Sequence, residues 1–126
     1  TGALIVIPGM SPLDSIVETG DRLDAIVNRR LLMNLFFKNS PLHDGAVIIS
    51  GNRVEAARCT LPISERDLPP QFGMRHKAAA GISEATDASV VVVSEETGHI
   101  TFFKAGNYTE INNLNELKLL LSEAMK

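Results

Sequence analysis

Short apolar runs separated by Pro and Gly residues dominate the pattern of the chain and predict strands. The run Ala3–Ile7 is rich in β-branched residues and is followed by Pro8 and Gly9, which predicts a buried strand and then a turn. Residues 10–20 are expected to form a loop with a brief extended segment at 15–17. Further runs predict two hairpins, because turn residues join the strands of each pair. The paired runs are 46–50 with 53–60, and 88–94 with 100–104.

Three other segments show helical spacing. From about Asp24 apolar residues recur every three or four positions, with Asp24 or Asn28 available as the N-cap. The alanines at 75–84 favour a second helix. A capping box of Asn113 and Glu116 starts a third, whose leucine stripe is expected to pack in the core. The order strand, helix, hairpin, helix, hairpin, helix predicts an α/β fold with a mixed sheet, because hairpins supply antiparallel pairs and helical crossovers supply parallel ones.

Length and composition fit one soluble globular domain. The chain has 126 residues, of which 44% are hydrophobic and 21% are charged, which is enough for a single core. Trp is absent, Tyr occurs once and the net charge is −3. These values argue against a nucleic-acid-binding protein that uses stacked aromatic residues or a basic surface. Any anion site must therefore be local.

The single cysteine and the first residue give further expectations. Cys59 cannot form an internal disulfide, so a reducing compartment is expected, with Cys59 as a small core hydrophobe. No apolar run approaches the roughly 18 residues of a membrane-spanning helix. The chain begins at Thr1 rather than at Met, directly before a predicted core strand. We therefore expect one domain, residues 1–126, cut out of a longer protein.

Two acidic clusters lie at the ends of predicted strands, where α/β folds collect binding groups. In the cluster 43–46, Asp44 can hold a divalent metal ion, and the following Gly and Ala leave room for a ligand. In the cluster 94–98, Glu95 and Glu96 are suited to complete a metal site or to orient a sugar hydroxyl. Both clusters are also typical of ordinary polar turns.

A basic cluster stands at the start of the second predicted helix. Arg75, His76 and Lys77 follow Gly73 and Met74, although the positive end of a helix dipole repels cations. Together with the free backbone N–H groups of the first turn, these side chains are suited to bind phosphate. The alternative is a solvated basic turn. No P-loop or GxGxxG motif is present to supply the phosphate cradle in a commoner way.

These clusters, in this order, resemble the diadenylate cyclase domain family, whose members make cyclic di-AMP, a second messenger, from two ATP molecules. The resemblance extends over most of the chain up to about Gly106 and is strongest to the membrane-anchored bacterial subgroup. It implies a mixed, mostly antiparallel-paired sheet flanked by helices. The matching motifs are Gly2-Ala3-Leu4-Ile5, Val17-Glu18-Thr19-Gly20, Pro41-Leu42-His43-Asp44-Gly45-Ala46-Val47-Ile48-Ile49, Leu61-Pro62-Ile63-Ser64, Arg75-His76-Lys77-Ala78-Ala79, Gly81-Ile82-Ser83-Glu84 and Val93-Ser94-Glu95-Glu96-Thr97-Gly98.

The resemblance also implies roles for individual residues. The implied catalytic residues are Asp44, Gly45, Arg75, His76 and Lys77. The implied ATP contacts are Gly45, Ala46, Leu61, Met74, Arg75, His76, Lys77, Ser94 and Glu95. The implied ligands of a divalent metal ion, Mn²⁺, Mg²⁺ or Co²⁺, are Asp44, His43 and Glu96. Catalysis is expected to need a homodimer in which two such domains lie face to face, and no nucleic acid is expected to bind. The domain is expected on the cytoplasmic side of the bacterial membrane. Only an N-terminal segment outside this chain would contact that membrane.

Two residues depart from the family pattern. Lys77 stands where most members have Arg, which keeps the charge but loses the two-pronged grip on phosphate. Met74 stands where many members have Thr, which removes a hydroxyl group. An active enzyme is the favoured hypothesis. Two alternatives remain open: an ATP-binding regulatory module of the same fold with weak or no turnover, and an interaction domain that binds no nucleotide.

Overall fold

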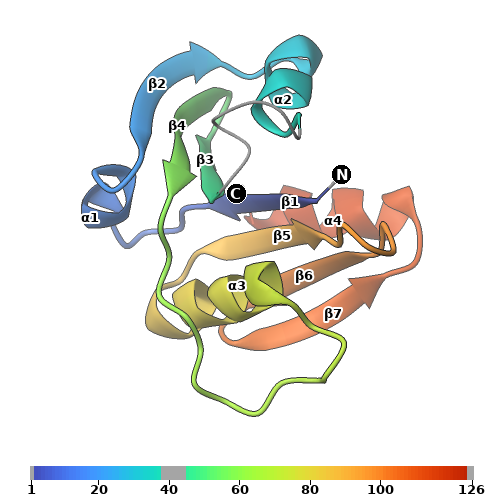
Figure 1. Cartoon of the computed structure of the whole chain (residues 1–126). Helices are drawn as coiled ribbons and strands as arrows, with labels where there is room; N and C mark the ends of the chain where they lie inside the picture. Colours follow the sequence, from blue (N-terminus) through green and yellow to red (C-terminus); the bar gives the residue numbers. More distant parts are fainter. Residues whose placement is uncertain (1, 38–44, 125–126) are drawn as a thin grey trace.

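The centre of the molecule is a seven-stranded sheet. The structure, a computed structural model, describes residues 2–37 and 45–124 (Figure 1). The strand order is β2-β4-β3-β1-β5-β6-β7. Among the described strands only β1 and β3 pair in parallel, so the predicted α/β fold with a mixed, mostly antiparallel sheet is confirmed. The strands are β1 (Ala3–Ile7), β2 (Asp21–Ile26), β3 (Ala46–Ser50), β4 (Arg53–Cys59), β5 (Ser89–Val93), β6 (Ile100–Lys104) and β7 (Asn107–Ile111).

Helices cover both faces of this sheet. In Figure 1 the helix α3 (Met74–Ala85) lies in front of the sheet, and α4 (Leu114–Ala124) lies behind it. The helix α2 (Arg29–Leu35) packs on β3 and β4, and α1 (Asp14–Val17) is a single turn next to β4. The two sheet faces are therefore buried by different helices, and α3 is the one that begins near the ends of β1 and β5.

Alternating side chains along the strands divide the core into two clusters. Leu4 and Val6 on β1 face α3 together with Val90 and Val92 on β5, and all four are at most 3% exposed. Val47, the residue between two members of this cluster on β3, faces the other way and packs with α2. This is the two-residue period of a sheet that is buried on both faces.

The first predicted helix is only partly correct. Residues 21–26 form the edge strand β2, which pairs with β4, so the helix begins at Arg29 and not near Asp24. Asp24 has a φ of 49° at an irregularity in this pairing. Asn28 is the N-cap, because its side-chain oxygen accepts a hydrogen bond from the Leu31 N–H at 2.9 Å. Pairing with a distant strand overrides the local helical spacing here.

Two further predictions need correction, and one strand was missed. Residues 15–17 belong to the short helix α1 rather than to an extended segment. The strand β7 was not predicted at all. The leucine stripe of α4 is not core: Leu114 is 67% exposed, and the other apolar side chains facing the sheet are only half-buried. The capping box is confirmed, since the Glu116 N–H donates to the Asn113 side chain at 3.0 Å.

A network of polar contacts fastens the loop 60–73 to α3 and to the β6–β7 turn. The Ser64 N–H donates to the Lys77 carbonyl at 3.0 Å, and the Ser64 hydroxyl donates to Glu84 at 2.7 Å. Arg66 forms an ion pair with the same Glu84 carboxylate and donates to the Gly106 carbonyl. The loop therefore has a defined course along α3, from Lys77 near its start to Glu84 near its end. No helix in the two described ranges is both long enough and apolar enough to span a bilayer.

Candidate functional site

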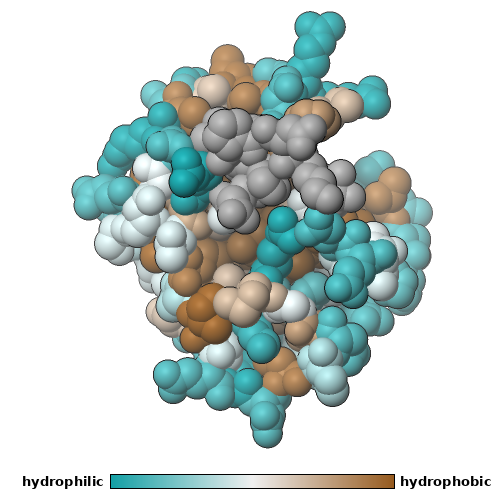
Figure 2. Space-filling view, in the orientation of Figure 1, coloured by the Kyte–Doolittle hydropathy of each residue, from teal (hydrophilic) through white to brown (hydrophobic). Residues whose placement is uncertain are grey.

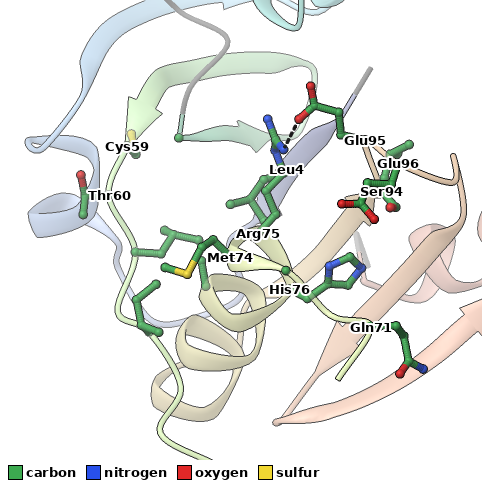
Figure 3. A pocket seen from close by; sticks show the side chains of 16 residues that line it. Leu4, Cys59, Thr60, Gln71, Met74, Arg75, His76, Ser94, Glu95 and Glu96 are labelled. Carbon is green, nitrogen blue, oxygen red and sulfur yellow. Dashed lines mark hydrogen bonds and ion pairs between the residues drawn. The ribbon is translucent and has the colours of Figure 1, made fainter. Parts of the chain in front are cut away.

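A cavity of about 490 Å³ lies where α3 begins, between the ends of β1 and β5 and the loop 60–73 (Figure 3). This volume is in the range of small-molecule pockets, about 300–1,000 Å³. Its walls combine apolar side chains, such as Leu4 and Leu61, with polar groups from α3 and from the turn after β5. Figure 2 shows the corresponding face of the molecule, on which hydrophobic and hydrophilic side chains lie next to each other.

Among the described residues Arg75 is the cation that lines this cavity, and its guanidinium lies between Glu95 and the backbone of Gly2. Its Nη1 lies 3.3 Å from Glu95 Oε2, the contact drawn as a dashed line in Figure 3. A β-carbon on Gly2 would lie 2.7 Å from the same nitrogen, so the guanidinium rests against bare backbone. The Arg75 side chain is 25% exposed and that of Glu95 is 49% exposed. A pair this exposed contributes little to stability, so an anionic ligand can replace Glu95 at low cost.

The backbone at the start of α3 adds donors to this cation. Gly73 is the N-cap residue and offers no side-chain oxygen to the first turn. The first N–H groups of a helix have no partner within the helix and carry the positive end of its dipole. Because Gly73, Met74 and Arg75 all line the cavity, this helix end faces it. The combination is suited to bind a phosphate group.

His76 is the most buried polar group of the site, with 7% of the residue exposed. Burial lowers the pKa of its imidazole below the usual value, and the neighbouring Arg75 charge lowers this pKa further. The lowered pKa favours the neutral form of the ring at pH 7. A neutral imidazole carries one N–H donor and one acceptor nitrogen, so His76 can donate a single hydrogen bond to a ligand without adding charge.

Gly45 forms the wall on the β3 side, and no other residue fits there. Its φ is 88°, and an added β-carbon would lie 2.9 Å from the backbone of both Arg58 and Cys59. Conformation and space therefore both require glycine. Asp44, which precedes Gly45 in the chain, and His43 lie outside the described residues.

The structure brings together most of the residues that the sequence singled out. Eight of them line the cavity: Gly45, Leu61, Met74, Arg75, His76, Ser94, Glu95 and Glu96. Two do not, since Ala46 is fully buried in the core and Lys77 is exposed on α3 away from the cavity lining. Eight further lining residues had no predicted role in the site: Leu4, Cys59, Thr60, Ile63, Gln71, Gly73, Ala78 and Val93.

The oxygen donors of the site are of the type that a hard divalent cation prefers. Ser94, Glu95 and Glu96 line the cavity together, and carboxylate and hydroxyl oxygens suit Mg²⁺ or Mn²⁺. Within residues 2–37 and 45–124, no group of three metal-ligating side chains is already assembled. Among the described residues, the carboxylates of Glu95 and Glu96 are the side chains of this cavity that could hold such a cation.

Cys59 also borders the cavity, but its thiol is expected to be unreactive. It is 1% exposed, and burial, aided by the Asp21 carboxylate, raises the pKa of the thiol to about 11. Two units above the ordinary value mean roughly 100-fold less thiolate at neutral pH. We expect alkylation by iodoacetamide at pH 7.5 to be at least that much slower than in the guanidinium-unfolded chain. Mass spectrometry measures the alkylation rate, and equal rates in the folded and the unfolded chain would contradict this prediction.

Comparisons with known proteins agree with one another. Residues 1–108 match the sequence model of a family described as DisA bacterial checkpoint controller nucleotide-binding, the DAC family. A diadenylate cyclase of Listeria monocytogenes is 45% identical over 97% of this chain and 45% of its own length. The cyclic di-AMP synthase CdaA of Bacillus subtilis is 43% identical over 99% of this chain and 46% of its own length.

The fold agrees as well. A crystal structure of DacA from Staphylococcus aureus, an N166C/T172C double mutant, superposes with a TM-score of 0.95 at 41% identity. The match covers 98% of this chain and 83% of that one. The chain spans about half the length of the curated relatives. With a family match over most of its residues, the chain belongs to the diadenylate cyclase domain family.

Proposed function

We propose that this chain is the catalytic domain of a diadenylate cyclase, which condenses two ATP molecules into cyclic di-AMP and two pyrophosphates. The observation that carries the proposal is the position of Arg75 and His76, at a helix start that faces Ser94 and Glu95 across one cavity. The relatives named diadenylate cyclase and cyclic di-AMP synthase support it over nearly the whole chain.

The two kinds of wall suggest how one ATP lies in the cavity. Leu4, Leu61 and Ile63 offer apolar surface to the adenine ring, since pockets usually bury the flat, apolar part of a ligand against such side chains. The triphosphate extends toward Arg75 and the first turn of α3, where the positive groups gather. The phosphates displace Glu95 from Arg75, because an exposed ion pair has little energy to lose.

In the proposed reaction the 3′-oxygen of each ATP attacks the α-phosphorus of the other. The bond between that phosphorus and the oxygen that bridges the α- and β-phosphates breaks, and pyrophosphate leaves. Arg75 stabilises the negative charge that develops on the departing pyrophosphate, and His76 donates one hydrogen bond to it. Asp44 accepts the proton of the attacking hydroxyl. Glu96, Asp44 and His43 are the proposed ligands of a divalent metal ion, which when bound would lower the pKa of that hydroxyl.

The proposed site needs a second copy of the domain. One cavity of about 490 Å³ with one set of phosphate-binding groups accommodates one ATP, whereas the reaction joins two. A two-fold contact would bring two such cavities face to face and make each ATP the partner of the other. Activity per molecule should then rise with protein concentration.

The proposal extends to a full-length protein anchored in a bacterial membrane, with this domain on the cytoplasmic side.

The test is incubation with ATP and either Mn²⁺ or Mg²⁺, followed by chromatography of the products. Cyclic di-AMP is expected from the wild-type protein, and Asp44→Asn should abolish it. Asp67→Asn is the matched control, because Asp67 is exposed on the loop 60–73 and does not line the cavity. Tight ATP binding without product, at every metal and protein concentration tried, would instead support the regulatory module. No shift of the melting temperature with ATP would support an interaction domain.

A further inference from the structure

We propose that Phe72 is a positioning residue for His76, and that it sets the orientation of the imidazole toward the phosphate side of the cavity. The inference rests on the proposed function for its catalytic consequence, but its geometry is independent of that function. The Phe72 and His76 rings are stacked, with centroids 4.4 Å apart and an interplanar angle of 13°. Both residues are buried, at 8% and 7% exposure.

No hydrogen bond within the described residues holds the imidazole of His76. Among those residues neither ring nitrogen donates or accepts a hydrogen bond, and neither is a fully buried polar atom. A site histidine is normally oriented by a hydrogen bond from its second nitrogen to a carboxylate or a carbonyl. No such partner lies in residues 2–37 or 45–124, and there the flat contact with Phe72, together with the edge contact of Phe103, restricts rotation of the imidazole. The nitrogens remain available to a ligand.

Phe72 is itself held from its other sides. Phe103 meets it edge-on at 6.0 Å, and Tyr108 of β7 does so at 5.1 Å. The Phe72 N–H donates to the Pro69 carbonyl at 3.0 Å, which fixes the turn that carries the ring. Phe103 also contacts His76 edge-on, at 6.4 Å. The imidazole is thus one member of an aromatic cluster that joins α3 to β6 and β7.

The consequence of losing the stack can be stated as a change in rate. Aromatic pairs contribute modestly beyond their buried area, and that contribution corresponds to about a 2- to 10-fold change in an equilibrium between ring orientations. Because His76 is proposed to act on charge that develops during the reaction, the loss should appear in kcat more than in KM.

The test compares three variants of the whole chain. Phe72→Leu removes the ring but keeps apolar volume, Phe72→Tyr restores an aromatic face, and Phe102→Leu is the matched control. Phe102 is equally buried, at 6% exposure, but its paired position places it on the sheet face opposite Phe103 and α3. Three quantities are measured: the ¹H and ¹⁵N resonances of the His76 ring without ligand, the change in them on titration with pyrophosphate, and the kinetics of cyclic di-AMP formation.

In the wild type the His76 ring protons should be shifted by the Phe72 ring current. Phe72→Leu should abolish this shift, weaken the response to pyrophosphate and lower kcat about 2- to 10-fold with little change in KM, whereas Phe72→Tyr should restore all three. Loss of the shift with an unchanged pyrophosphate response would overturn the inference, as would equal effects in Phe102→Leu. If the wild type forms no cyclic di-AMP, the proposed function fails, but the two resonance measurements still decide the role of Phe72.

Discussion

Replacing Arg75 by alanine should reduce the formation of cyclic di-AMP by about 10²- to 10³-fold, the usual loss when one donor to a developing negative charge is removed. Arg75 is the cation that lines the cavity, and it lies at the end of α3 that faces the proposed phosphate position. Arg75→Lys should recover part of the rate, because lysine keeps the charge but not the fork of donors. Product formation at saturating ATP measures the effect.

The control for this prediction is Arg30→Ala. Arg30 is exposed on α2 and does not line the cavity, so the same change in net charge there should leave the rate unchanged. Melting temperatures of the Arg75 variants should stay close to that of the wild type, since the ion pair with Glu95 is solvent-exposed. If Arg75→Ala turned over ATP as fast as Arg30→Ala, the proposed phosphate position would be wrong.

Replacing Gly81 by alanine should destabilise the domain, although helix propensity alone predicts the opposite sign. In an exposed helix the change from Gly to Ala stabilises by about 1 kcal/mol. Here the added β-carbon would lie 1.9 Å from the Pro62 carbonyl oxygen and 3.0 Å from the Ser64 nitrogen. Backbone must therefore move, and such overpacking typically costs about 1–3 kcal/mol. Thermal unfolding should show a midpoint several degrees lower.

The same substitution should also weaken ATP binding, because the displaced loop carries Leu61, Ile63 and Gln71 into the cavity wall. Gly73→Ala, at the other end of α3, is the matched control for the melting temperature. Its added β-carbon would have no neighbour within 4 Å, so only the preference for glycine over alanine at the N-cap is lost and its midpoint should fall less than that of Gly81→Ala. An increase in stability for Gly81→Ala would mean that the loop 60–73 yields easily and that its close contact with α3 is not required.

Short-range sequence patterns were sufficient to predict the hairpins, the helix α3 and two helix starts. The paired runs of the two hairpins, the alanines of α3 and the caps at Asn28 and Asn113 are all confirmed. The missed strands lack such signals. In β2, Ile26 is followed directly by Val27, which fits helical spacing as well as a strand, and only the pairing with β4, about 30 residues later, decides between them.

The strand β7 was missed for a different reason. It is an exposed edge strand, and the turn before it consists of Ala105 and Gly106, both with positive φ. Alanine rarely adopts that conformation, so the turn does not show the Asn-Gly or Asp-Gly pattern of a short hairpin. Tyr108 lies on this strand, and the aromatic contact with Phe72 could not be inferred before β7 was known.

The structure brings together the predicted site residues that lie at element ends, but not Lys77, for which a face of the helix had to be chosen. Arg75 and Glu95 come together because α3 begins, and β5 ends, at the same side of the sheet. Lys77 lies only two residues beyond Arg75, but two residues along a helix turn a side chain by about 200°. The structure places Lys77 in solvent, and its contact with phosphate stays a prediction.

The position of β1 in the sheet has a practical consequence for the design of fragments. It pairs in parallel with β3 on one side and antiparallel with β5 on the other, so among the described strands it is the one that joins β2-β4-β3 to β5-β6-β7. A fragment that starts after Ile7 would leave two unpaired apolar edges in the middle of the molecule, and such edges promote aggregation. A shortened version of this domain therefore has to retain β1 if it is to fold.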